Sequence, residues 1–94
     1  MLFFIRCRDK AGAAEVRAAN RAAHLAYLEQ HAGQIIAAGP TLTEDREGMT
    51  GSVLFMDFPD RAAAEAFAAA DPYATAGLFD SVEILPWKQV YPRP

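Results

Sequence analysis

The two histidines of the chain, His24 and His31, are the side chains best suited to acid–base chemistry. An unperturbed imidazole has a pKa near ~6.5, so it can accept or release a proton close to neutral pH. Their seven-residue spacing places both near one face of a helix, but about 10 Å apart along its axis. Because that separation is too large for one ion, the pair does not predict a metal centre.

The neighbours of the two histidines suggest different roles. His31 lies where a long helix is expected to end, and there an imidazole complements the helix dipole and bonds the last carbonyls. His24 lies in mid-helix, with Asn20 and Arg21 one turn before it and Tyr27 one turn after it. His24 is therefore either a general acid–base residue or a structural histidine satisfied by Asn20, a carbonyl or water.

Asp71 also has two interpretations. It precedes Pro72 and can cap a short turn that follows the second expected helix. Alternatively its carboxylate reaches His24, selects one tautomer of the imidazole and raises its basicity, as the acid of a catalytic triad does. The local sequence is compatible with both roles.

No nucleophile is evident among the remaining candidates. Cys7, the only cysteine, is expected on the helix-covered face of a strand, where a buried thiol is usually inert. Ser52 follows Gly51 but lacks the pattern of a nucleophile elbow. Arg6 and Arg8 lie in the opposite phase to Cys7, and they are either solvated, paired with acidic side chains, or able to hold a ligand anion.

Composition narrows the class of protein. The 94 residues fit a single domain over 1–94, and 52% hydrophobic with 22% charged residues is typical of a globular chain. The net charge of −3, without a run of Lys or Arg, argues against nucleic acid or an anionic membrane as a partner. A single cysteine cannot form an internal disulfide. The N-terminal stretch resembles neither a signal peptide nor a membrane span. We therefore expect a cytoplasmic location.

Strand-forming and helix-forming segments alternate along the chain. We expect strands over 2–8, 34–38, 50–58 and 81–91, helices over 13–32 and 60–70, and a polar loop over 41–48. Gly33 is expected as the C-cap of the first helix, and Gly39-Pro40 as the stop of the second strand. Asp60 is expected as the N-cap of the second helix.

The resulting βαββαβ order predicts an α+β, ferredoxin-like fold, with two helices on one face of a four-stranded antiparallel sheet. The face without helices would carry Phe4, Phe55 and Trp87. Because a bare aromatic face of this kind marks an interface, we expect a homodimer packed sheet to sheet.

Several short segments together resemble one known family, the YciI-like (YCII-related) proteins, over essentially the whole chain. They are MLFFIRCRDKAGA at the N-terminus, RAAHLAYL at 21–28, AAGP at 37–40, GS at 51–52, AAADPYATAGLF at 68–79 and the closing VEILPWKQVY. Each is weak alone, but their order and spacing are specific.

This resemblance implies a ferredoxin-like fold of the dimeric α+β barrel type and a pocket centred on a His–Asp pair, which falls on His24 and Asp71. It implies no organic cofactor and no metal. Family members with assigned chemistry act on small cyclic or aromatic compounds, and a dehydrochlorinase of a chlorinated hydroxyquinol is the best-known type. The substrate itself does not transfer, because the segment 41–49 is short and acidic here.

These residues are compatible with two main functions and with a third that is disfavoured. The first is a cofactor-independent enzyme for elimination or isomerisation, with His24 and Asp71 as catalytic pair and substrate-binding residues drawn from Arg6, Arg8, Ser52 and Tyr73, with Phe79 as an apolar wall. The alternative is a non-catalytic dimeric module that binds a small molecule. The fold-related α+β barrel oxygenases and isomerases are a third possibility, disfavoured by the DPY segment.

Overall fold

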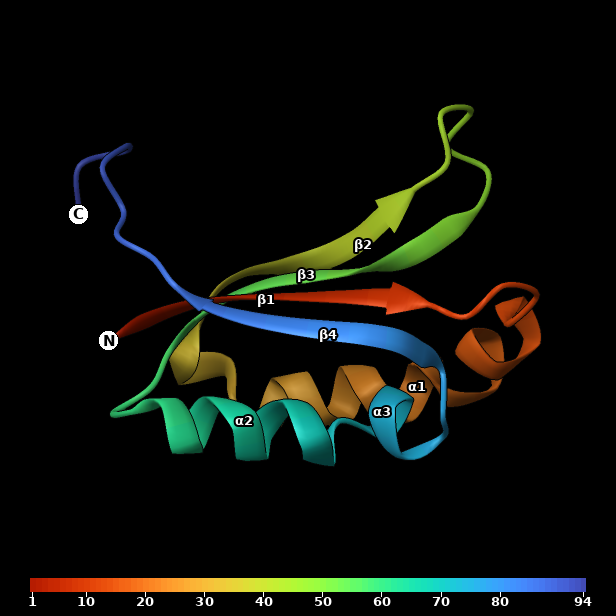
Figure 1. The fold of residues 1–94 in the computed structure, drawn as a ribbon, viewed down its shortest axis with the longest axis horizontal. Helices are drawn as coiled ribbons and strands as arrows, with labels where there is room; N and C mark the ends of the chain where they lie inside the picture. Colours follow the sequence, from red (N-terminus) through yellow and green to blue (C-terminus); the bar gives the residue numbers. More distant parts are fainter.

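A computed structural model describes all residues from 1 to 94. Its strands are β1 (Leu2–Asp9), β2 (Ile35–Leu42), β3 (Met49–Asp57) and β4 (Phe79–Pro86), which form one antiparallel sheet in the order β2-β3-β1-β4. The helices are α1 (Ala14–Gln30), α2 (Arg61–Ala70) and the single turn α3 (Pro72–Thr75), and a 3₁₀ turn covers Ala32–Gln34. All helices lie on one face of the sheet (Figure 1), which confirms the ferredoxin-like α+β fold.

The core lies between the central strands and α2. Strand alternation directs Phe3 and Ile5 of β1 toward the helices, and the β1–β3 register places Met56 and Leu54 beside them. Helix α2 closes this layer with Phe67, which is 5% exposed. The apolar side chains of α2 therefore supply most of the helical contribution to the core.

Helix α1 is different, because its two buried side chains are Arg17 and His24. A helix that only covered a sheet would place apolar groups at such positions. The inward face of α1 is thus polar where the inward face of α2 is apolar, and this asymmetry locates the candidate site.

The ends of the elements follow the expected capping chemistry in part. Asp60 caps α2 by accepting the Ala63 N–H at 2.8 Å, and Pro72 begins α3. At the end of α1, His31 Nδ1–H donates to the Tyr27 carbonyl at 2.9 Å, the structural role predicted for it. Gly33, in contrast, is not the C-cap: His31 ends α1, and Gly33 lies within the 3₁₀ turn that follows.

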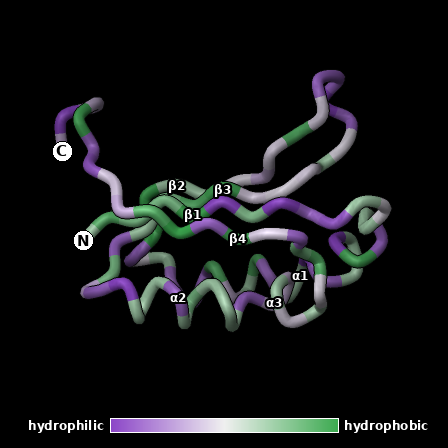
Figure 2. The backbone as a smooth tube through the Cα atoms, viewed as in Figure 1, coloured by the Kyte–Doolittle hydropathy of each residue, from purple (hydrophilic) through white to green (hydrophobic).

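Two strand boundaries also differ from the prediction. Strand β2 continues through Gly39-Pro40 to Leu42, because β2 is an edge strand and needs no N–H from Pro40 on its open side. Because β2 extends to Leu42, the loop between β2 and β3 is shorter than predicted, and its tip is hydrophilic (Figure 2). Strand β4 ends at Pro86, earlier than the expected Tyr91.

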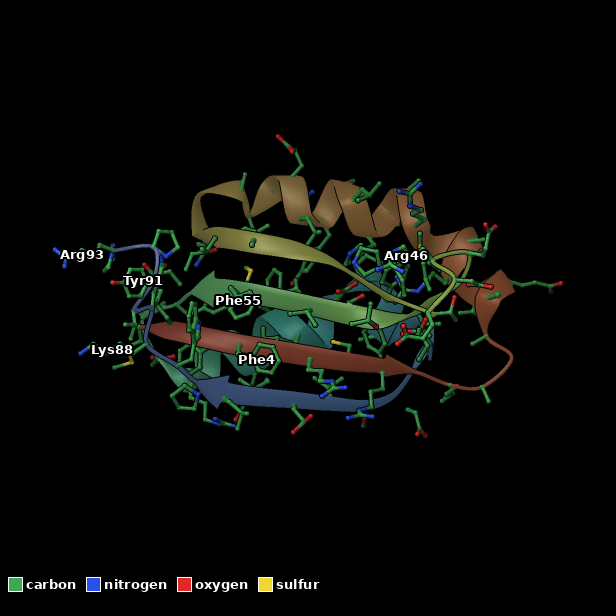
Figure 3. The ribbon with its side chains drawn as sticks, turned by 90° about the horizontal axis from the view of Figure 1, so that it is seen from above. Phe4, Arg46, Phe55, Lys88, Tyr91 and Arg93 are labelled. Carbon is green, nitrogen blue, oxygen red and sulfur yellow. The ribbon has the colours of Figure 1, made fainter.

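The second face of the sheet has no helix over it. Phe4 and Phe55 lie side by side there with ring centroids 5.4 Å apart, and Trp87 packs edge-on against Phe55 at 4.7 Å. Figure 3 looks onto this face and shows both phenylalanine rings at its centre. Leu85, paired with Phe4 across the strands, is 49% exposed. The structure thus leaves an aromatic sheet face open in the single protomer.

Gly51 allows the close approach of β1 and β3 next to Ser52. A Cβ at this position would collide with the Cys7 carbonyl. We expect Gly51→Ala to destabilise the protein by about 1–3 kcal/mol, because the two central strands must separate to admit the methyl group. Urea unfolding measures the change. Gly33→Ala is the matched control, since a Cβ at Gly33 meets nothing within 4 Å, and equal losses in both variants would contradict this packing argument.

Candidate active site

Asp71 connects α3 to His24 through one oxygen atom. Its Oδ1 lies 2.9 Å from Nδ1 of His24 and also accepts the backbone N–H of Tyr73 at 2.9 Å. Both Asp71 and His24 are buried, with 3% and 7% of their surface exposed. The capping role and the histidine-binding role, which the sequence leaves as alternatives, therefore occur together.

Helix α3 is held at both ends although it has only one turn. Pro72 begins it, and Gly77 ends it with a φ of 76°, a conformation that glycine adopts without strain. The Leu78 N–H donates to the Tyr73 carbonyl at 3.1 Å and the Gly77 N–H to that of Ala74 at 3.0 Å, the paired bonds of a Schellman motif. These contacts fix the segment that carries both Asp71 and Tyr73.

Tyr73 supports the imidazole from its face. The two rings stack with centroids 4.0 Å apart and an interplanar angle of 16°. Asp71 thus orients His24 at its edge while Tyr73 restrains it at its face. Because a carboxylate only accepts, this contact suits a proton on Nδ1 and a free lone pair on Nε2, which makes no hydrogen bond within the protein.

Arg17 forms a buried ion pair beneath the site. Its Nε and one Nη bind the two carboxylate oxygens of Asp9 at 2.7 and 2.9 Å, and the same Nη donates to Ser52 Oγ at 3.0 Å. Burial alone would lower the pKa of Arg17, but the hydrogen bond and charge of Asp9 outweigh it and raise the pKa. The guanidinium also lies 4.6 Å from the centre of the Tyr73 ring, so it supports the face of Tyr73.

A cavity of about 130 Å³ opens beside these groups, between α1, α3 and the β2–β3 hairpin. Its polar lining consists of Arg17, Arg21, His24, Ser52 and Tyr73. Its remaining wall is apolar or backbone and comes from Leu25, Leu28, Ala38, Gly39, Pro40, Met49 and Leu54. This is the form of a small-molecule site: a mostly apolar hollow with a few converging polar groups.

The structure brings four of the predicted site residues to this cavity: His24, Ser52 and Tyr73 line it, and Asp71 lies behind His24. Arg6 and Arg8 are not brought there, because strand alternation places them on the opposite face of β1 from Cys7. Phe79 packs nearly perpendicular to the Tyr73 ring, with centroids 6.1 Å apart, but does not line the cavity.

Three residues of the site were not predicted: Arg17, Arg21 and Asp9. A signal for the two arginines exists, since Arg17, Arg21, His24 and Leu28 follow an i, i+4, i+7, i+11 pattern along one face of α1. Asp9 could not be found in this way, because its partner lies in another element and only the tertiary fold brings them together.

No point in the structure gathers three or more His, Cys, Asp or Glu side chains in a metal-binding arrangement. None of the helices combines the length and the apolar character that a membrane crossing demands.

Cys7 is buried behind the site and is expected to be unreactive in the folded protein. Burial, reinforced by the charges of Asp71 and Asp9, raises the pKa of its thiol to about 12. The thiolate is then scarce at pH 8, and iodoacetamide should label Cys7 only after unfolding in urea, as mass spectrometry can follow. Labelling of the native protein at the rate of the unfolded chain would contradict this.

The raised pKa of Cys7 also makes stability depend on pH. The folded protein keeps this thiol protonated, whereas the thiol of the unfolded chain ionises above its ordinary pKa of 9.0. The free energy of unfolding therefore falls as pH rises from 9.0 toward the raised pKa.

The fold and the cavity define a ferredoxin-like α+β domain with a histidine–aspartate pocket between one helix layer and the sheet. The chain belongs to the YCII-related domain family, whose family model matches residues 1–88. It is 39% identical to the protein YciI of Escherichia coli O6:H1, in an alignment covering 97% of this chain and the whole of that protein.

Two solved structures are similar to this chain to different degrees. A 5-chloro-2-hydroxyhydroquinone dehydrochlorinase, TftG from Burkholderia phenoliruptrix AC1100, superposes with a TM-score of 0.88 at 41% identity over 94% of each chain. That structure is a complex with 2,5-dihydroxybenzoquinone. SnoaB, a cofactor-independent oxygenase from Streptomyces nogalater, superposes with a TM-score of 0.56 at 18% identity over 97% of this chain and 95% of its own. This second likeness shows the shared fold alone.

Proposed function

We propose that the protein is a cofactor-independent enzyme that uses His24 as a general base, oriented by Asp71, on a small cyclic or aromatic compound. The observation that carries the proposal is the 2.9 Å contact between His24 Nδ1 and Asp71 Oδ1 beside an open cavity. A proton on Nδ1 suits this contact, because a carboxylate only accepts, and it leaves the lone pair of Nε2 available to a substrate. Proton transfer by a residue held in this way typically contributes ~10²- to 10⁴-fold in rate.

The reaction that suits a single base is elimination or isomerisation. Nε2 takes a proton from the substrate, and the electron pair left behind forms a new double bond. In an elimination a leaving group such as chloride departs with the electron pair of its own bond, so that HX is lost and no oxidant or reductant is consumed. In an isomerisation the imidazolium returns the proton to another atom of the ring. TftG, a dehydrochlorinase by name and 41% identical to this chain, supports the first of these.

We assign substrate binding to Ser52 and Tyr73, because both side chains line the cavity. Ser52 Oγ accepts a hydrogen bond from Arg17, so its own hydroxyl proton remains free to donate toward the cavity that it lines. Burial raises the pKa of Tyr73, although the charge of Arg17 opposes the rise, so the phenol stays neutral at physiological pH. Both groups are therefore hydrogen-bond donors to a ring oxygen.

Replacement of His24 tests the catalytic role directly. With 5-chloro-2-hydroxyhydroquinone as the first substrate to be screened, we expect His24→Gln to lower kcat by about 10²- to 10⁴-fold. Asp71→Asn should lower it as well while keeping an oxygen that accepts the Tyr73 N–H, so that the cap survives. Circular dichroism confirms folding, and steady-state kinetics measures the loss.

The matched control is His31→Gln, which removes the other imidazole at the end of α1, outside the cavity. Turnover by this variant should remain close to that of the parent protein. If His24→Gln retains full turnover, His24 is not the base. If the parent protein binds hydroxylated and halogenated aromatics without converting any of them, the alternative holds, and the protein is a small-molecule-binding module.

We further propose that the protein works as a homodimer through its open sheet face. The support is the cluster of Phe4, Phe55 and Trp87, together with the half-exposed Leu85, on a face that no helix covers. An apolar area of this kind is costly in water and is typical of an interface between subunits.

Sedimentation at micromolar concentration should show a species of twice the 10.2 kDa chain mass. Phe55→Asp places a charge at the centre of the face and should shift the protein toward monomer, since an unpaired charge is costly to bury. Val90→Asp, in the exposed C-terminal segment, is the control. A parent protein that sediments as a monomer would contradict the dimer.

A further inference from the structure

The cavity carries one positive charge that the protein leaves uncompensated. No Asp or Glu lines it, whereas Arg17, Arg21 and His24 do. Arg17 is neutralised by its two bonds to Asp9, and His24 is held by Asp71. The side chain of Arg21 takes part in no ion pair and in no hydrogen bond with another residue of the chain.

Arg21 lies at the rim of the cavity beside the catalytic candidates. It is four residues after Arg17 and three before His24, so all three emerge from the same face of α1. Its charge acts on the Tyr73 hydroxyl, where it opposes the rise in pKa that burial causes. Arg21 is exposed to solvent and lines the same cavity as Tyr73, the ring that stacks on His24.

The dimensions of the cavity limit what the arginine can bind. A volume of about 130 Å³ is close to that of a cavity known to hold benzene, ~150 Å³, so one ring with small substituents fits. Leu28 and Leu54 offer apolar walls to such a ring, while Ser52 offers a donor. A planar guanidinium is suited to a carboxylate or phenolate on the same ring, because it can donate two parallel hydrogen bonds.

From these observations we infer that Arg21 is the specificity-determining residue of the site and selects a small planar ring compound that carries one negative charge. The inference rests on the proposed function for its assignment of the cavity as a substrate site. It differs from the expectation that Arg6 or Arg8 holds the anion, because those side chains leave β1 on the open face of the sheet.

Two isosteric probes test the charge preference without requiring turnover. Benzoate and benzamide have the same shape but differ in charge, and binding of each can be followed by NMR from the shifts of the His24 imidazole signals. We expect benzoate to bind the parent protein at least about tenfold more tightly than benzamide, as a charge-assisted hydrogen bond predicts. Arg21→Gln should abolish this preference, and Arg21→Lys should retain part of it.

Arg61→Gln is the matched control, since it removes a guanidinium from the exposed surface of α2, where Arg61 pairs with Glu65. This variant should keep the preference for benzoate. Equal binding of the two probes by the parent protein, absence of binding by both, or a preference that survives Arg21→Gln would each overturn the inference. A charge preference that depends on Arg21, in a protein without turnover, would preserve the inference while refuting the proposed catalysis.

Discussion

The hydrogen bond between Asp71 and His24 is the interaction on which the site depends. One carboxylate oxygen both caps α3 and accepts Nδ1–H of the imidazole, so the start of a helix and the tautomer of a histidine are determined together. The same short helix places the Tyr73 ring against the imidazole. Any movement of α3 would therefore change the edge contact and the face contact of His24 at once. The motif DPY is compact because it encodes the carboxylate, the helix start and the stacking ring in three successive residues.

A buried ion pair supports this arrangement from below. Arg17 is bound by Asp9 through two bonds, donates to Ser52, and lies against the Tyr73 ring. Because burial of two charges costs desolvation energy, the ion pair adds little net stability to the folded protein. Removal of one partner, in contrast, leaves an unpaired buried charge and lowers the free energy of unfolding by about 3–5 kcal/mol. Since α1 buries Arg17 and His24 where α2 buries Ala64 and Phe67, the chain has exchanged apolar packing on one helix for a polar site. The sheet and α2 form most of the core, whereas α1, α3 and the β2–β3 hairpin line the pocket.

Much of the fold follows from local patterns in the sequence. The Asp60 and Pro72 signals mark true helix starts, and period-two alternation in β1 and β3 separates the core face from the open face. The failures have tertiary causes: Pro40 is tolerated inside β2 because β2 is an edge strand, which no local signal reveals. For the site, family resemblance pointed to His24 and Asp71, but the fold alone shows that one oxygen serves both roles. Arg17 was missed because a buried arginine can be predicted only together with the acidic side chain that pairs with it. That side chain, Asp9, lies in another element, and only the fold brings the two together.

The proposed base requires that Asp71 holds His24 as the Nδ1–H tautomer and leaves Nε2 unprotonated in the cavity. Nitrogen-15 NMR of the histidine side chains measures this directly, with His31 as an internal reference whose Nδ1–H faces the Tyr27 carbonyl. At a pH where His24 is neutral, we expect a protonated Nδ1 and an unprotonated Nε2 for His24, with the proton redistributed in Asp71→Asn. A His24 ring that carries its proton on Nε2, or one whose tautomer is the same in Asp71→Asn, would contradict this role of Asp71.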